Sequence, residues 1–185
     1  MRRSEKREHL VDVALRQFTR LGYRAVGIDL VIAESGVAKT TLYRHFKSKE
    51  DLIVAVLRRI DEDFRNAMRH TVDAASGDGR AKLLATFDYL ERWLAGDGFH
   101  GCPFVSAAGE YGGRNNPVFQ EAAMHKRLML AYFEELARAA GLDDPAGMAG
   151  AINLLHEGAT AVAHVSADPS AASRAKAIAA RLLAA

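Results

Sequence analysis

The chain has 185 residues, a length that suits one compact domain or two small ones and excludes a large multidomain enzyme. Hydrophobic residues make up 49% of the chain and charged residues 26%, so wholesale disorder is not expected. The single cysteine, Cys102, excludes an intrachain disulfide, and no apolar stretch near the start forms a secretory signal. We expect a cytoplasmic protein without a membrane span, because even the most apolar region, 145–166, carries two histidines, a glutamate and an asparagine.

Charge is distributed unevenly along the chain. Residues 1–50 hold 11 Lys and Arg against 6 Asp and Glu, a net charge of +5, whereas residues 51–185 carry a net charge of −3. A basic segment attached to a slightly acidic body indicates that the N-terminal part binds a polyanion. An ordinary solvated basic face gives the same excess, so charge alone does not decide between the two.

Helical periodicity dominates the sequence, because apolar residues recur at intervals of three and four. The pairs Asn116-Pro117, Asp144-Pro145 and Asp168-Pro169 are typical of helix starts, and glycine clusters separate most other segments. The expected fold is therefore all-α. About nine helices are predicted, near residues 3–21, 28–35, 39–46, 49–74, 80–96, 103–111, 117–140, 145–166 and 170–184.

Two of these helices, 28–35 and 39–46, are separated by a tight turn at Ser35-Gly36-Val37. Gly36 can adopt the positive φ that such a turn requires. We expect an inward-facing set to fix the angle between the helices, namely Val31, Ala33, Val37, Leu42 and Phe46. This is helix-turn-helix spacing, although a purely structural helical hairpin has the same outline.

The second of these helices has an outward face that suits the DNA major groove. Leu42 and Phe46 share one stripe, which leaves Thr40, Arg44 and Lys47 on the opposite side. Arginine can donate two hydrogen bonds to guanine and threonine can contact a thymine methyl, whereas Tyr43, His45 and Lys49 are better placed to donate to phosphates. The predicted DNA-binding residues are Lys39, Thr40, Thr41, Tyr43, Arg44, His45 and Lys49.

The same region resembles the DNA-binding domain of the TetR family of transcriptional regulators. The resemblance rests on Gly-Tyr at 22–23, SGVAKTTLYRHF at 35–46 and SKEDL at 48–52. Gly27-Ile28 replaces an early threonine that is frequent in the family, and Ile32 replaces a small residue. Helix 28–35 is therefore expected to make fewer DNA contacts, with Asp29 acting mainly as a partner of the helix dipole.

The resemblance implies a three-helix helix-turn-helix domain at residues 1–48 and a larger ligand-binding and dimerisation domain at 49–185. It further implies a homodimeric repressor that binds a palindromic double-stranded DNA operator and is released by a small, partly apolar effector. In that picture the ligand shifts the helix at 49–74 and so changes the separation of the two recognition helices. The candidate effector contacts are Phe64, Met68, Phe87, Trp93, Cys102, Phe104, Glu110, Tyr111, Phe119, His125, Met129 and His156.

The last two predicted helices carry many alanines, which permit close helix approach, and the resemblance identifies them as the dimer interface. An intrachain hairpin would explain the alanines equally well. The predicted interface residues are Leu155, Val162, Ala163, Ala175, Ile178 and Leu182.

Two other classes of protein fit the sequence less well. An enzyme is not expected, and neither is a cofactor, because no nucleophile–base pair, metal-ligand spacing or phosphate-binding loop is recognisable. Glu110, His125 and His156 are interpreted as polar groups rather than a metal site, and a redox role for Cys102 stays open. A nonspecific architectural DNA-binding protein conflicts with the low net charge and the acidic larger domain.

Overall fold

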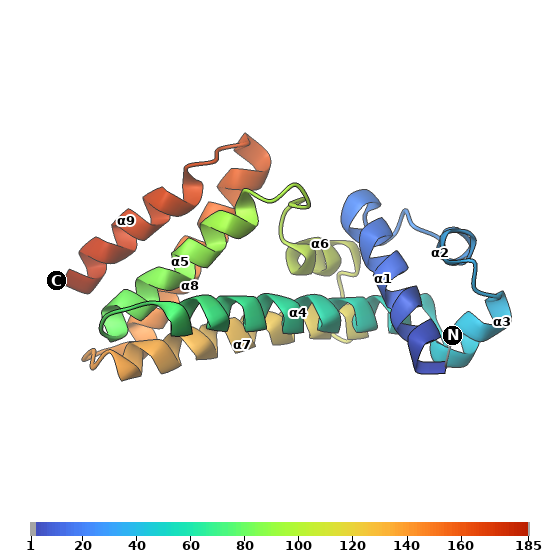
Figure 1. Ribbon diagram of the computed structural model, residues 1–185, viewed down its shortest axis with the longest axis horizontal. Helices are drawn as coiled ribbons and strands as arrows, with labels where there is room; N and C mark the ends of the chain where they lie inside the picture. The colour runs from blue at the N-terminus through green and yellow to red at the C-terminus, as the bar shows by residue number, and fades with distance from the viewer. Residues whose placement is uncertain (1–2, 185) are drawn as a thin grey trace. The chain divides into compact units, whose positions relative to one another are not determined.

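The computed structural model describes residues 3–184, and every helix expected from the sequence is present in that range. No strand occurs among these described residues, so the all-α prediction is confirmed. The helices are α1 (Arg3–Leu21), α2 (Ile28–Ser35), α3 (Lys39–His45), α4 (Lys49–Ala74), α5 (Gly79–Leu94), α6 (Pro103–Glu110), α7 (Pro117–Ala139), α8 (Pro145–Ser166) and α9 (Ala171–Ala184) (Figure 1).

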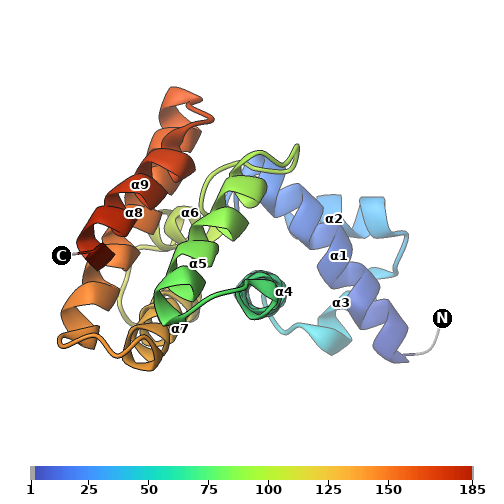
Figure 2. The ribbon, with the colours of Figure 1, turned by 60° about the vertical axis from the view of Figure 1, so that its left-hand side comes forward.

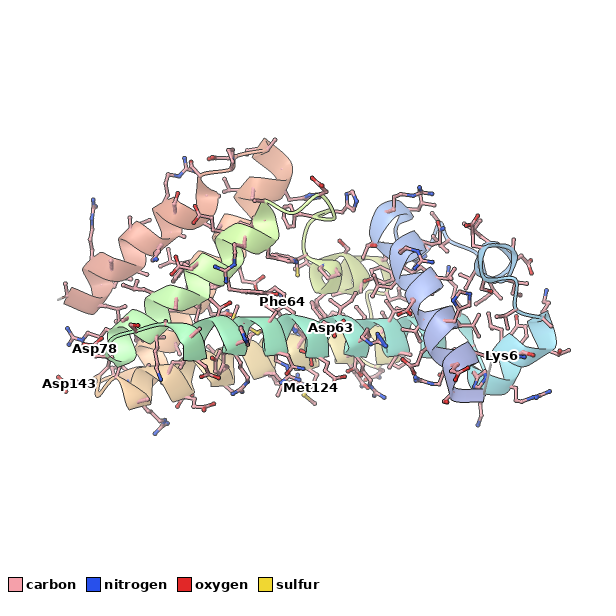
Figure 3. All side chains as sticks on the ribbon, in the orientation of Figure 1. Lys6, Asp63, Phe64, Asp78, Met124 and Asp143 are labelled. Atoms are coloured by element: carbon pink, nitrogen blue, oxygen red, sulfur yellow. The ribbon has the colours of Figure 1, made fainter. Side chains whose placement is uncertain are left out.

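Capping residues explain where several helices begin. α8 begins at Pro145 after Asp144, whose Oδ1 accepts a hydrogen bond from the Gly147 amide at 2.9 Å. α5 begins after Asp78, labelled in Figure 3, whose Oδ1 accepts from the Ala81 amide at 3.0 Å. Asp168 differs, because its Oδ1 accepts from the amide and hydroxyl of Ser170, and this turn delays the start of α9 to Ala171.

The described residues fall into two compact units. The first unit lies within Met1–Glu62 and Pro103–His125, and the second lies within Asp63–Cys102 and Lys126–Ala185. α4 and α7 each contribute residues to both units. Among the described residues, no helix combines the length and the apolarity needed to cross a membrane.

The core of the first unit packs α1 to α4 around large apolar side chains that are fully buried, including Leu10, Phe18, Leu42, Leu52 and Ile53. Val31, Val37, Leu42 and Phe46 are buried as predicted. The prediction for Ala33 was wrong, because its side chain is exposed. At 3.6 residues per turn, Ala33 lies roughly 200° around α2 from Val31 and so points away from the core.

The core of the second unit gathers side chains from α5, α8 and α9 and from the parts of α4 and α7 that belong to it. Its buried members include Met68, Leu83, Phe133, Ile152 and Leu183. α8 and α9 are joined by a short turn and lie side by side in both views of the ribbon (Figures 1 and 2). Gly79 lets α5 begin in close contact with the end of α7, since a Cβ there would lie 2.4 Å from the Ala140 Cα.

Candidate nucleic-acid interface

The turn between α2 and α3 has helix-turn-helix geometry. Gly36 has a φ of +64°, a conformation that side-chain-bearing residues rarely adopt. Its amide donates to the Ile32 carbonyl at 3.0 Å, and the Val37 amide donates to the Ser35 hydroxyl at 3.2 Å. The predicted turn at Ser35-Gly36-Val37 is therefore confirmed, with glycine at the position that requires positive φ.

α1 contacts both helices of this motif. The His9 Nε2 atom lies 3.1 Å from the Ser35 carbonyl oxygen at the end of α2. The Arg7 guanidinium lies 5.4 Å from the centre of the Phe46 ring, just after α3. These two contacts connect α1 to the end of α2 and to the residue that follows α3.

The outward face of α3 has the orientation expected from its sequence. Leu42 is fully buried and Phe46 is 3% exposed, while Thr40, Arg44 and Lys47 are exposed. Tyr43 leaves 45% of its surface exposed. Thr41 and His45 are half-buried at the edges of this face. A small polar and basic surface with an exposed tyrosine is therefore available to a nucleic acid, and the individual DNA contacts remain predictions.

Lys39 at the start of α3 is paired with Asp29 in the first turn of α2. Their Nζ and Oδ1 atoms lie 2.9 Å apart, and this hydrogen bond raises the pKa of the lysine. The α2 N-terminus has no side-chain cap, because Gly27 occupies that position. Asp29 therefore serves both the helix terminus and Lys39, and periodicity gives no signal for the second role.

Lys49 at the start of α4 is half-buried and directed back to an earlier loop. Its Nζ donates to the Arg24 carbonyl at 3.1 Å, and burial lowers its pKa. The ammonium group has three donors, so two stay available for a phosphate. The Ser48 hydroxyl accepts from the Asp51 amide at 3.1 Å, which uses one of the N–H groups at the start of this helix.

α4 is also tied to α1 through Arg59. Its guanidinium contacts the Glu8 carboxylate at 2.7 Å and the Asp12 carboxylate at 3.4 Å. The hydrogen bond from Arg59 lowers the pKa of Glu8. The N-terminal half of α4 is therefore fixed against α1, the helix that supports the helix-turn-helix motif of α2 and α3, which we call the reading motif.

Five of the candidate effector contacts lie in the first unit, and two of them, His125 and Glu110, form hydrogen bonds within the protein. His125 is buried, stacks on the Phe104 ring with a centroid distance of 3.6 Å, and places Nδ1 2.7 Å from the Asp61 carboxylate. The Glu110 carboxylate accepts hydrogen bonds from two backbone amides of the loop at 22–24. The first-unit candidates are Phe104, Glu110, Tyr111, Phe119 and His125.

The second unit holds the remaining candidates, namely Phe64, Met68, Phe87, Trp93, Cys102, Met129 and His156. Figure 3 shows the Phe64 side chain leaving α4 on the side of α5, where its ring lies 4.9 Å from that of Tyr89 and 5.2 Å from that of Trp93. No motif or spacing in the sequence had singled out Tyr89. Cys102 receives a hydrogen bond from the Lys126 ammonium at 3.3 Å.

His156 is a buried, neutral histidine in this second unit. Its Nε2 donates to the Thr86 hydroxyl at 3.0 Å, and that hydroxyl donates to the Leu83 carbonyl at 2.6 Å. The rings of Phe87 and Phe133 lie 4.3 and 4.8 Å away. Burial lowers the pKa of His156 to about 3. Among the described residues, no group of three potential metal-ligating side chains comes together around it or elsewhere.

The predicted interface residues occupy the α8–α9 hairpin. Val162, Ile178 and Leu182 are 38%, 47% and 42% exposed, whereas Ala175 is packed inside the hairpin. Leu154 and Val165, which the prediction missed, are 73% and 82% exposed. This side of the hairpin therefore carries large apolar side chains that the chain itself leaves uncovered.

A three-helix helix-turn-helix bundle joined to a larger helical body defines a class of DNA-binding regulators. Comparison with known proteins agrees with that class. Residues 10–56 match the model of bacterial regulatory proteins of the tetR family, and residues 79–179 match the tetracyclin repressor-like C-terminal domain. The chain belongs to the TetR family, and it is a DNA-binding transcriptional regulator rather than an enzyme.

Individual relatives share parts of the chain. FasR, an HTH-type transcriptional activator of Mycolicibacterium smegmatis, is 39% identical over 93 residues, which cover 48% of this chain and 42% of FasR. KstR2, an HTH-type transcriptional repressor of Rhodococcus jostii, is 36% identical over 84 residues, which cover 45% of this chain and 40% of KstR2. The chain thus spans less than half the length of these two relatives.

The similarity of fold extends over nearly the whole chain. A crystal structure of a TetR-family transcriptional regulator from Streptomyces coelicolor superposes with a TM-score of 0.90 at 30% sequence identity. The superposition covers 97% of this chain and 95% of the other.

Proposed function

We propose that the protein is a homodimeric repressor that binds a palindromic operator with α3 in the major groove and is released by a small, partly apolar effector. The DNA-binding domain is assigned to residues 1–48 and the ligand-binding and dimerisation domain to residues 49–185. The observation that carries the proposal is the α3 surface, where Leu42 and Phe46 are buried and the polar residues opposite them are exposed.

The residues of this face divide into readers of bases and holders of phosphates. Arg44 is exposed at the middle of the outward face and is assigned to a guanine, with Thr40 beside it. Tyr43 and Lys49 flank the face and are assigned to phosphates, together with Lys39, Thr41 and His45. Lys39 must then break its hydrogen bond to Asp29 in order to bind a phosphate, and this limits its net contribution to DNA affinity.

Dimerisation is supported by the uncovered side of the α8–α9 hairpin. A shallow apolar groove of about 210 Å³ lies there, lined by residues that include Leu154, Val162 and Ile178. A two-fold axis on this face would pack two hairpins into a four-helix bundle and cover these side chains in both copies. A dimer also has two α3 helices, one for each half-site of a palindrome, whereas a single chain has one.

Repression and release are the finer parts of the proposal. FasR is an activator and KstR2 is a repressor, so these relatives do not decide between activation and repression. We choose repression because a dimer seated on a promoter excludes other proteins without any further contact surface. The aromatic groups around Phe64 favour an effector that is partly apolar. We place the protein in the cytoplasm, because the DNA of a bacterial cell lies in that compartment.

Selection of duplexes from a random pool by the purified chain tests the DNA part of this proposal. The expected product is a two-fold symmetric sequence that binds two chains. Arg44→Ala should relax the preference at one position of each half-site, while Arg138→Ala, an exposed change on α7 of the second unit, should not. Recovery of no common sequence, or of a site that binds one chain, would contradict the proposal.

Sedimentation of two matched variants tests the dimer. Ile178→Glu places a charge on the proposed interface and is expected to give monomers, because an unpaired buried carboxylate is costly. Val105→Glu makes the same kind of change at a side chain that is 56% exposed on α6 and should leave the dimer intact. If the two variants had the same oligomeric state, the α8–α9 face would be excluded as the dimer interface.

A further inference from the structure

The loop at residues 22–24, between α1 and α2, is bound to both ends of α6. The Tyr23 hydroxyl donates to the Pro103 carbonyl at 3.1 Å. At the other end of α6, the Glu110 carboxylate accepts from the Tyr23 amide at 3.0 Å and from the Arg24 amide at 2.6 Å. The Arg24 Nε also donates to the Glu110 carbonyl at 2.6 Å. We call this set of four hydrogen bonds the α6 clamp.

The local backbone is shaped to receive the carboxylate. Gly22 has a φ of +87°, and a Cβ at this position would lie 3.3 Å from Glu110 Oε1. Each carboxylate oxygen accepts from one backbone N–H group, so the amides of Tyr23 and Arg24 are both satisfied by one side chain. Hydrogen bonds to an ionised acceptor are about twice as strong as neutral ones. Tyr23, only 1% exposed, anchors the loop against Phe18.

The clamped loop is connected to both ends of the reading motif. α2 begins at Ile28, four residues after Arg24. The Arg24 carbonyl accepts from Lys49, the first residue of α4, which follows α3. The Arg24 guanidinium lies 5.6 Å from the centre of the Tyr111 ring, directly after α6. The position of this loop therefore sets where the helix-turn-helix segment starts and where it ends.

We propose that Glu110 is a positioning residue for DNA reading, which holds the loop at 22–24 so that α3 is presented in one orientation. The inference rests on the proposed function, since it concerns the same reading helix. Glu110 touches no DNA in this arrangement and acts through Tyr23 and Arg24. A prearranged reading helix binds its operator without first losing alternative orientations, so the clamp increases specific affinity.

Glu110→Gln is the informative variant, because it keeps the size of the side chain and changes only its hydrogen bonding. One of the two oxygens becomes an NH₂ group, which faces a backbone donor instead of accepting from it. The matched control is Glu121→Gln in the same unit, which removes the 3.0 Å pair with Arg58 and leaves the loop untouched. Both variants lose one negative charge, so a general electrostatic effect on DNA binding appears in both.

The experiment measures the affinities of wild type and the two variants for the selected duplex and for a scrambled duplex. The temperature is chosen so that all three proteins are fully folded by circular dichroism. Glu110→Gln is expected to bind the selected duplex about tenfold more weakly than Glu121→Gln does. Its affinity for the scrambled duplex should match that of the control. Amide exchange at Tyr23 and Arg24 should accelerate in Glu110→Gln alone.

An unchanged ratio between the two duplexes, or tighter binding of the selected one, overturns the positioning role. If Glu110→Gln does not fold, Tyr23→Phe removes the hydroxyl that donates to Pro103 and should lower the same ratio to a smaller extent. A wild-type ratio in folded Tyr23→Phe then overturns the role. Failure of the wild-type chain to select any DNA is seen before a variant is made, and it removes both the proposed function and the inference.

Discussion

Replacement of Lys47 by alanine should change the salt dependence of operator binding by a predictable amount. Lys47 is exposed in the connection between α3 and α4, two residues after the end of α3, where we expect its ammonium to reach a phosphate. The logarithm of the binding constant falls with the logarithm of salt concentration by about 0.9 for each neutralised phosphate. A dimer carries two copies of Lys47, so Lys47→Ala should make the slope less steep by about 1.8.

The assay is fluorescence anisotropy of the labelled operator at five salt concentrations, with Lys82→Ala on α5 as the matched control. Tyr43→Phe sharpens the comparison, because it removes a neutral donor. It should weaken binding by about 0.5–1.5 kcal/mol per hydrogen bond and leave the slope unchanged. A wild-type slope in Lys47→Ala would refute the proposed contact between Lys47 and a phosphate.

Three further predictions concern stability. Gly79→Ala should destabilise the protein by about 1–3 kcal/mol in urea unfolding, because the added Cβ meets the backbone of Ala140, whereas Gly98→Ala has nothing within 4 Å and should show no loss. Ala167→Gly should raise stability by about 1 kcal/mol, because Ala167 holds a φ of +49° at the end of α8; a lower melting temperature would contradict this. Burial lowers the pKa of His156 from 6.5 to about 3, so only the unfolded chain binds this proton between those values. Stability should therefore fall as the pH drops from 6.5, by at most about 1.4 kcal/mol per pH unit from this group, and the difference between wild type and His156→Leu should carry that slope.

The sequence determined the helices and the reading motif because those features depend on local interactions. Apolar spacing and capping pairs set the limits of α7 and α8, and Gly36 fixed the turn through its own backbone freedom. The two sides of α3 followed from Leu42 and Phe46, which are one turn apart. These features also carried the resemblance to the TetR family, which the comparisons confirm.

Tertiary structure alone decided which groups meet. Periodicity predicts which side of a helix is buried but not what covers it. The predicted burial of Ala33 was wrong because Ala33 lies about 200° around α2 from the buried Val31. Glu110 was interpreted as an effector contact, yet its carboxylate binds amides 86 and 87 residues away. Lys49 and the Arg24 carbonyl are 25 residues apart. Such pairs form only when the folded chain brings distant donors and acceptors within about 3 Å, a condition that a local pattern of residue types does not encode.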